Sequence, residues 1–232
     1  MIAITFALPA ESSEFLSRLD AKSRFDRNGI RTIRGTIDDR EVEVMHTGVG
    51  EKVCRERLRK FVDDQKFEFL VSAGFAGSLN HELRVNDLLV AKNFSTVDLK
   101  HAQLSLSNVS VHAANVLTVS ALIDSSEERE RIARESGASA VDMETEFIAR
   151  ACAAHGIPLL SLRVITDTPN QPFPAPSSVL FDIQQQRTHI AVLARFFLAH
   201  PNRVPGLVQF ARRIARARKT LADALVEVVR TM

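Results

Sequence analysis

The sequence predicts a single three-layer α/β domain in which helices cover both faces of a central mixed β-sheet, with a helical extension at its C-terminal end. The length of 232 residues is typical of one such domain. Hydrophobic residues form 45% of the chain, which is sufficient for a large core. Short apolar runs alternate with segments of helical periodicity, as in a sheet flanked by helices. We assign residues 1–232 to one domain, of which residues 177–232 form the basic helical extension.

The clearest unit runs from residue 138 to residue 167 and has the pattern strand, helix, strand. Its short first strand ends just before Glu144, and apolar residues at helical spacing follow. Gly156 is placed as the C-terminal glycine of that helix. The apolar run 157–165 has the length of a strand buried on both faces, and Asp167 follows it directly.

The start of the chain repeats this arrangement. Residues 2–7 form an apolar strand, Pro9 opens a helix at a position that proline tolerates, and Glu11 lies just inside that helix. Glu11, Glu144 and Asp167 therefore each follow a strand of a predicted parallel sheet. Because ligands of open α/β sheets bind beyond the carboxyl ends of the strands, we expect one sheet edge to gather the three carboxylates.

The remaining elements follow from the same periodicities and from turn residues. Further strands are predicted at residues 29–37, 40–46, 67–73, 88–93, 109–111 and 116–119. Further helices are predicted at about residues 51–65, 125–137, 177–199 and 205–230. The proline-dense segment 169–176 is predicted to be a loop and is a candidate mobile flap over the site.

Two glycine-containing segments are candidate ligand contacts. The sequence T-G-V-G at residues 47–50 precedes a predicted helix, so its amides either bind an anion or form a tight turn. The sequence S-A-G-F-A-G-S-L at residues 72–79 directly follows a predicted strand. Its small residues allow the backbone to approach a ligand closely.

The charge is distributed unevenly along the chain. Residues 187–232 hold nine Lys and Arg against two acidic residues, a net +7, so the rest of the chain carries −5 of the overall +2. We interpret the basic residues as a solvated helix face, and peripheral contact with an anionic membrane surface is the alternative. Nucleic-acid binding is not expected, because no reading motif accompanies the charge.

Cysteine, histidine and targeting patterns suggest a cytoplasmic protein without a cofactor. Cys54 and Cys152 lie in predicted helices, have no metal-ligand spacing and suit a reducing compartment. The seven histidines show no metal or triad pattern, and His46 is expected to be a buried, hydrogen-bonded residue. The N-terminal apolar run lacks the basic residues of a secretory signal, and no run reaches the length of a membrane span. We expect neither a metal nor an organic cofactor.

Five motifs in order, L-P-A-E, T-G-V-G, S-A-G-F-A-G-S-L, V-D-M-E and R-V-I-T-D, resemble the nucleoside phosphorylase superfamily. The resemblance is greatest to its nucleosidase branch, typified by methylthioadenosine/S-adenosylhomocysteine nucleosidase, and covers roughly residues 1–93 and 138–170. It implies a phosphorylase/hydrolase-like fold, a homo-oligomer, and cleavage of the N-ribosyl bond of a purine nucleoside. The substrate would be of the adenosine type with a 5′ substituent.

The resemblance also implies roles for individual residues. Glu11 would position or activate the attacking water, Asp167 would protonate or hydrogen-bond the purine N7, and Glu144 would hold the two ribose hydroxyls. Met143 would pack against the sugar. The other expected substrate contacts are Ala73 and Gly74 at the base, and Thr166.

The chemistry agrees with these roles. An acid lets the base leave neutral, an ionised carboxylate accepts hydrogen bonds from a diol, and a second carboxylate activates water. Each residue also has a structural alternative. Glu11, Asp142 and Glu144 stand at helix starts, where acids complement the helix dipole, and Asp167 has the position of a turn aspartate.

Ser72 and Phe75 stand where phosphorylases of this superfamily place the Arg and the Ser that bind phosphate. This difference favours water as the nucleophile, with Arg31, Arg34 and Arg55 as other phosphate ligands to consider. The segment of about residues 94–138 is shorter than in the nucleosidases, and no base-stacking aromatic residue is assigned there.

This shortened middle and the basic tail also resemble the hopanoid-associated phosphorylases. Two alternatives to hydrolysis therefore stay open. One is phosphorolysis, with phosphate and a hopanoid-linked adenosine as substrates. The other is a nucleoside-binding protein without catalytic activity.

Overall fold

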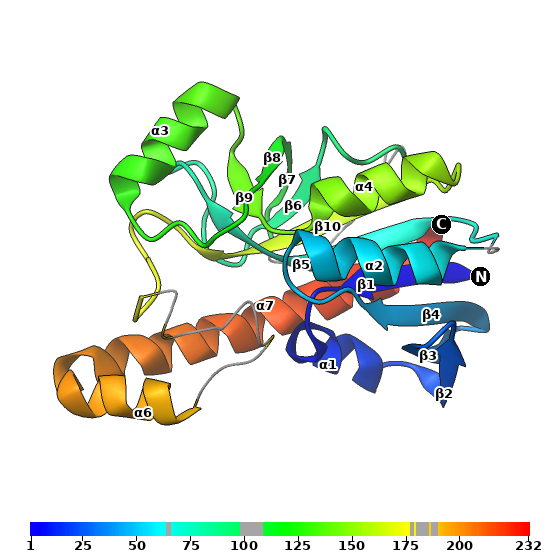
Figure 1. The fold of residues 1–232 in the computed structure, drawn as a ribbon, viewed down its shortest axis with the longest axis horizontal. Helices are drawn as coiled ribbons and strands as arrows, with labels where there is room; N and C mark the ends of the chain where they lie inside the picture. Colours follow the sequence, from blue (N-terminus) through cyan, green and yellow to red (C-terminus); the bar gives the residue numbers. More distant parts are fainter. Residues whose placement is uncertain (64–65, 98–108, 177–178, 180–185, 187–189) are drawn as a thin grey trace.

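The computed structural model describes residues 1–63, 66–97, 109–176, 179, 186 and 190–232, and it has an α/β architecture (Figure 1). The strands are β1 (Ile2–Phe6), β2 (Asp20–Arg27), β3 (Ile30–Ile37), β4 (Arg40–His46), β5 (Leu70–Ser78), β6 (Leu88–Ala91), β7 (Val111–Ala114), β8 (Val116–Thr118), β9 (Ala140–Asp142) and β10 (Leu159–Asp167). The α-helices are α1 (Pro9–Ser17), α2 (Glu51–Val62), α3 (Ser126–Ser136), α4 (Thr145–Ala154), α6 (Ile190–Ala199) and α7 (Val204–Thr231), and a 3-10 turn, η1, covers Pro201–Arg203. The predicted start of the helix at about residue 177 lies outside the described residues.

The described strands form one mixed sheet in the order β2-β3-β4-β1-β5-β10-β6-β7, with β9 paired to β5 and β8 paired to β9. Its centre consists of β4, β1, β5 and β10, which are parallel to one another. Their carboxyl ends therefore meet at one edge of the sheet. The predicted mixed sheet is confirmed.

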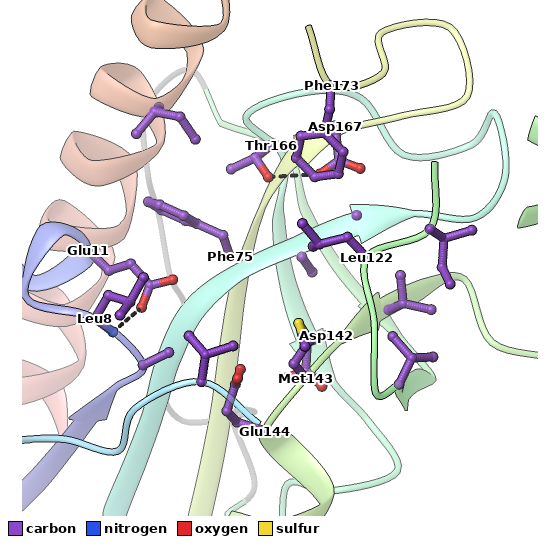
Figure 2. A pocket seen from close by; sticks show the side chains of 18 of the residues that line it. Leu8, Glu11, Phe75, Leu122, Asp142, Met143, Glu144, Thr166, Asp167 and Phe173 are labelled. Carbon is purple, nitrogen blue, oxygen red and sulfur yellow. Dashed lines mark hydrogen bonds between the residues drawn. The ribbon is translucent and has the colours of Figure 1, made fainter. Parts of the chain in front are cut away.

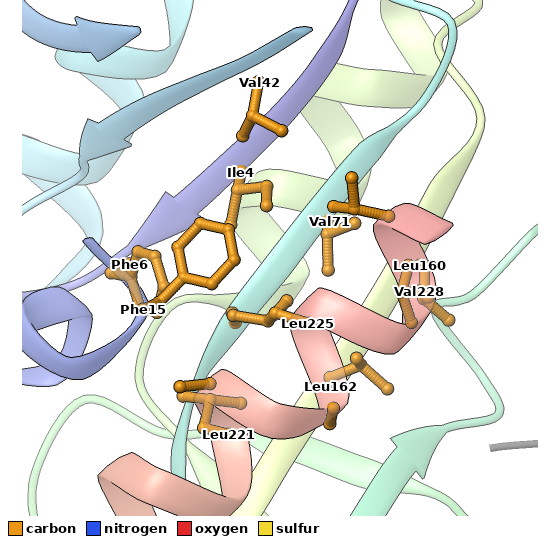
Figure 3. Packing of buried hydrophobic residues seen from close by; sticks show 14 of the residues in the cluster. Ile4, Phe6, Phe15, Val42, Val71, Leu160, Leu162, Leu221, Leu225 and Val228 are labelled. Atoms are coloured by element: carbon orange, nitrogen blue, oxygen red, sulfur yellow. The ribbon is translucent and has the colours of Figure 1, made fainter. Parts of the chain in front are cut away.

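Helices cover both faces of this sheet, as predicted. Ile4 and Phe6 of β1 belong to a core that includes Leu221 and Leu225 of α7 (Figure 3). Ala3, on the opposite face of β1, belongs to a second core built from α2 and α4. Successive residues of a strand point to opposite faces, so the buried run of β1 contributes to both cores.

The C-terminal helix α7 is 28 residues long and has two parts. Buried residues are concentrated in its second half, where Leu221, Leu225 and Val228 pack on the sheet. Its first half extends past the sheet together with α6 (Figure 1). The extension predicted from the basic tail thus contributes directly to the main core.

Three details differ from the sequence prediction. β2 was not predicted, because its eight residues, D-A-K-S-R-F-D-R, have no apolar alternation, and seven of them are exposed on an edge strand. The segment 72–78 was expected to follow a strand, but it lies within β5. Because its residues are small, side chains of neighbouring elements lie close to the backbone of β5. β9 is antiparallel to β5, so Glu144 does not follow a strand of the parallel set.

Candidate active site

Glu11, Glu144 and Asp167 line one cavity of about 430 Å³, and the predicted gathering of these carboxylates is confirmed (Figure 2). Glu11 and Asp167 follow β1 and β10 of the parallel centre. Glu144 reaches the same cavity from the opposite direction, because β9 runs antiparallel to β5. The pairings of Val141 with Gly77 and of Ala140 with Ser78 place β9 beside the carboxyl end of β5.

Glu11 is both a helix-capping residue and a wall of the cavity. Its Oε2 accepts a hydrogen bond of 3.0 Å from the backbone N–H of Leu8, which stands before the first turn of α1. Burial raises the pKa of this carboxyl, and the Leu8 hydrogen bond and the charge of Arg163 act in the opposite direction. Glu11 therefore stabilises the start of α1, which was its structural alternative. Only Oε2 takes part in this hydrogen bond to Leu8.

Glu144 stands at the start of α4, and its carboxyl is held by a different helix. Its Oε1 accepts a hydrogen bond of 3.1 Å from the N–H of Gly50, the residue before α2. Burial, followed by the nearby charges of Asp142 and Glu11, raises the pKa of Glu144 to about 8. The hydrogen bond from Gly50 and the charge of Arg163 act against this rise.

The T-G-V-G turn is occupied by groups of the chain itself. The amide of Gly48 donates to Ala7 O at 3.0 Å, and the amide of Val49 donates to Gln186 Oε1 at 2.6 Å. The amide of Gly50 donates to Glu144, as described above. These three amides therefore have acceptors within the chain, as expected for a tight turn, and one of the acceptors is the carboxyl of Glu144.

Asp167 forms a buried ion pair with Arg129 of α3. The distance from Arg129 Nη2 to Asp167 Oδ2 is 2.5 Å, and Thr166 Oγ1 donates to Asp167 Oδ1 at 3.0 Å. Burial raises the pKa of Asp167, and Arg129 and Thr166 act against that rise. The turn that follows is closed by Thr168, whose Oγ1 accepts the N–H of Gln171 at 3.2 Å, so Asp167 is not a turn aspartate.

Arg129 was not identified from the sequence. Its side chain is fully buried, and it also donates to Ser78 O and Ile123 O, each at 2.7 Å. The available signal was its spacing in α3, because Arg129 shares a helix face with the partly buried Ile132 and Ala133. A charged residue on such a face indicates a buried partner, although the sequence does not show which one.

A second buried arginine, Arg163 of β10, lies next to the carboxylates. Its Nε donates to Asp142 Oδ2 at 2.9 Å, and its Nη1 donates to Ser72 O at 2.7 Å. Asp142 also accepts from Thr118 Oγ1 at 2.8 Å and caps the first turn of α4 through the N–H of Thr145. Asp142 therefore has the structural role of an acid at the start of a helix, here α4.

A small second cavity of about 10 Å³ lies beside the large one and is lined by Glu11, Glu144 and Arg163. Thr5 also lines it, and the buried Thr5 Oγ1 has no hydrogen-bond partner within the described chain. A polar cavity of this size has room for a single water molecule.

The expected substrate contacts fall into two groups. Met143 and Thr166 line the large cavity, whereas Ala73 and Gly74 line the small one. The residues of β5 that line the large cavity with Asp167 are instead Phe75, Ala76 and Gly77. Gly77 is paired with Asp167, and a Cβ atom there would stand 2.7 Å from Asp167 Oδ2.

Comparison with known proteins agrees with this architecture. The family model described as "Phosphorylase superfamily" matches residues 95–199. The chain resembles this superfamily in sequence and in fold. It is 22% identical to a 5′-methylthioadenosine/S-adenosylhomocysteine nucleosidase of Staphylococcus aureus, in an alignment that covers 73% of this chain and 87% of that protein.

Solved structures of the same group have the same fold. A putative 5′-methylthioadenosine/S-adenosylhomocysteine nucleosidase of Borrelia burgdorferi, bound to adenine, matches with a TM-score of 0.73 at 20% identity over 100% of both chains. Futalosine hydrolase of Helicobacter pylori matches with a TM-score of 0.69 at 18% identity over 100% of this chain and 97% of that one. The family model and the relative in sequence confirm the motif resemblance to the nucleoside phosphorylase superfamily, and the solved structures show the shared fold.

Aromatic and aliphatic side chains close the large cavity. Phe75 of β5 and Phe173 of the proline-dense loop line it, and Figure 2 shows Phe173 on the Asp167 side. Phe173 packs edge-on against Phe210 of α7, with ring centroids 5.7 Å apart. Further lining residues from the two last helices are Leu193, Leu207, Phe210, Ile214 and Arg218. The aromatic residues that line the cavity thus come from β5, this loop and α7.

The other candidates from the sequence lie elsewhere. His46 hydrogen-bonds Ser12 at 2.8 Å, and burial lowers its pKa to about 4. Arg34 pairs with Glu43 and Arg55 pairs with Glu51. Within the described residues, neither these two arginines nor Arg31 lines either cavity.

The described parts of the chain contain no group of three or more His, Cys, Asp or Glu residues that could hold a metal ion. Cys54 and Cys152 are buried free thiols in α2 and α4. No described helix combines the length and the apolar character that crossing a membrane requires.

Proposed function

We propose that this protein hydrolyses the N-ribosyl bond of a purine nucleoside. The observation that carries the proposal is the convergence of three carboxylates on one cavity, with a second cavity of single-water size between two of them. The similar proteins named above are nucleosidases and a futalosine hydrolase. The names of the nucleosidases support an adenosine-type substrate with a substituent at the 5′ position.

Asp167 would act on the leaving base. Cleavage builds negative charge on the purine, and a carboxyl whose pKa is raised by burial is suited to give or share a proton at N7. Arg129 fixes the direction of this carboxyl through Oδ2. Phe173 lies on the same side of the cavity and would stack on the base (Figure 2).

Glu144 and Glu11 would act on the sugar side. Glu144 would accept hydrogen bonds from the ribose hydroxyls, with Met143 packed against the ring. Glu11 would position a water molecule in the small cavity and accept its proton as the oxygen attacks the anomeric carbon. The positive charge of Arg163 next to this cavity would stabilise the carboxylates as they ionise.

Water is favoured over phosphate for two reasons. A cavity of about 10 Å³ is too small for a phosphate ion, and the amides of the T-G-V-G turn already have acceptors in the chain. The test is chromatographic measurement of purine release from adenosine, methylthioadenosine and inosine, with and without phosphate. We expect release without phosphate. A strict requirement for phosphate would overturn hydrolysis in favour of phosphorolysis, and binding without release would indicate a non-catalytic nucleoside-binding protein.

A lipid-linked nucleoside is the second candidate substrate, and a specific surface favours it. Ile190 and Leu198 of α6 are 78% and 83% exposed, and Val192, Val204 and Val208 nearby are also exposed. Other apolar residues of α6 and α7, among them Leu193 and Phe210, line the cavity. A hopanoid-linked adenosine at an anionic membrane would use both features.

Co-sedimentation with vesicles of phosphatidylcholine and phosphatidylglycerol tests this second candidate. We expect binding that Leu198→Glu weakens and that Phe25→Glu, at an exposed apolar residue of β2, does not. Equal sedimentation of all three proteins would remove the membrane proposal. Assembly as a homo-oligomer stays a prediction, which light scattering after size exclusion tests.

A further inference from the structure

One charged side chain of the cavity has no role in the chemistry above. Three arginines line the two cavities, and two of them are paired: Arg129 with Asp167, and Arg163 with Asp142. Arg218 of α7 has no ion pair with any described carboxylate. Its Nε is buried and has no hydrogen-bond partner within the described chain.

The position of Arg218 in α7 is one where the helix is otherwise apolar. Leu207, Phe210 and Ile214 precede it on the cavity wall, and Leu221 follows it in the main core. The spacing of three and four residues puts all of them on one inward face. A guanidinium on such a face leaves at least one buried donor unsatisfied, which costs free energy unless a ligand supplies an acceptor.

Two other charged residues of α7, one on each side of Arg218, have partners within the described chain. Arg213 donates to Gln171 O at 2.8 Å and so holds the proline-dense loop. Asp223 pairs with Arg18 at the end of α1 at 3.2 Å. Arg218 lies between them along the helix, about 7.5 Å from Arg213. It therefore stands between the loop that covers the Asp167 side and the helix that carries Glu11.

We propose that Arg218 is a binding residue for an anionic group of the ligand. A guanidinium is charged at every relevant pH, has donors only, and matches the geometry of carboxylate and phosphate oxygens. This inference rests on the proposed function, because it assumes that the cavity holds a nucleoside. It adds a negatively charged group to the substrate chemistry.

Two sources of the anion share this chemistry. The nucleoside can carry it, as a carboxylate or phosphate at the end of its 5′ substituent. Alternatively, inorganic phosphate is a second substrate. In that case a phosphate oxygen bonds to the anomeric carbon while the bond to the purine breaks, the electron pair leaves with the purine, and a proton from Asp167 neutralises it.

Binding measurements separate the sources without depending on turnover. Isothermal titration calorimetry at fixed ionic strength would use three probes: 5′-carboxymethylthioadenosine, its neutral methyl ester, and inorganic phosphate. The proteins are the wild type, Arg218→Met, Arg218→Lys and the control Arg216→Met. Arg216 is an exposed arginine of the same helix, so its loss changes the net charge equally.

If the nucleoside carries the anion, the wild type binds the carboxylate at least tenfold more tightly than the ester. Arg218→Met then weakens the carboxylate roughly tenfold to a hundredfold and leaves the ester unchanged, as expected for a hydrogen bond to a charged group. If phosphate is the anion, the same loss appears for phosphate instead. Arg218→Lys should keep part of the affinity, and Arg216→Met should keep all of it.

Equal affinity of wild type and Arg218→Met for all three probes would overturn the inference. That outcome is distinguishable from failure of the proposed function, which is measured separately as purine release by the wild type. Anion binding that depends on Arg218, without purine release, would contradict the proposed hydrolysis and would still support the role of Arg218. Circular dichroism of each variant establishes that it is folded, and methionine preserves the apolar contacts of the side chain.

Discussion

At the scale of single residues, we expect both stability and activity to depend on the pair of Asp167 and Arg129. Both side chains are almost completely buried, at 3% and 2% exposure, so neither charge has water to replace its partner. Removing one member of a buried pair leaves an uncompensated charge, which typically costs about 3–5 kcal/mol.

We therefore expect Asp167→Asn to abolish purine release and also to lower the free energy of unfolding. Arg129→Gln should destabilise the fold by a similar amount. The double variant Asp167→Asn/Arg129→Gln should lose less than the sum, because no unpaired charge remains. Urea unfolding of the four proteins measures this cycle. Strictly additive losses would show that the two charges are not coupled, and undiminished purine release by folded Asp167→Asn would end its catalytic assignment.

Glu144 is expected to determine the preference for ribose. Glu144→Gln keeps the acceptor oxygen toward Gly50 and removes the charge that would bind the diol. We expect kcat/KM for adenosine to fall about 10²-fold or more, which corresponds to about 3 kcal/mol, and 2′-deoxyadenosine to lose less. Rate measurements on both nucleosides test this. An unchanged ratio would mean that Glu144 does not contact the 2′ hydroxyl.

At the scale of secondary structure elements, the glycines of β5 matter because they have no side chain where charged groups of the site approach the strand. Its glycines lie under charged groups of neighbouring elements. A Cβ at Gly77 would stand 2.7 Å from Asp167 Oδ2 and 3.2 Å from Arg129 Nη1. A Cβ at Gly74 would stand 3.6 Å from Glu11 Oε1, which is an ordinary contact.

These distances predict different effects for the same substitution. Gly77→Ala should displace the Asp167–Arg129 pair, cost about 1–3 kcal/mol of stability and reduce purine release strongly. Gly74→Ala should change stability by less than about 1 kcal/mol, so it is the matched control for stability. Thermal unfolding and purine release of both variants measure this. Equal effects of the two substitutions would contradict the close approach at Gly77.

At the scale of the whole molecule, the buried carboxyls make stability depend on pH. The pKa of Glu144 is raised from 4.5 to about 8, and the pKa values of Glu11 and Asp167 are also raised. Between the ordinary pKa and the raised pKa of each carboxyl, the folded chain keeps a proton that the unfolded chain has lost. The free energy of unfolding therefore falls as pH rises through this range. His46 acts oppositely, but only between about 4 and its ordinary 6.5.

We therefore expect the free energy of unfolding to decrease as pH rises from 6.5 to about 8, the window in which only the carboxyls contribute. Glu144→Gln should flatten this dependence, because the amide does not ionise. His46→Gln should leave the slope in this window unchanged. Urea titrations at several pH values give the slopes. A wild-type stability that rises across this window would contradict the burial of these carboxyls as ionisable groups.

The sequence by itself determined the order of most elements and the three carboxylates, because apolar periodicity and capping residues act over a few neighbouring positions. Glu11, Glu144 and Asp167 were predicted from their places after strands and from the motifs around them. β2 and the length of β5 were missed. The edge strand β2 has no apolar alternation, and the small residues of β5 read locally as a turn.

Only the tertiary structure decided which groups face one another. The antiparallel β9, the pairing of Asp167 with Arg129 and the occupation of the T-G-V-G turn by Glu144 all join positions far apart in the chain. Local periodicity indicates which face of an element is buried, but it does not indicate which distant side chain packs against that face. The charges and hydrogen bonds of the site depend on that second choice.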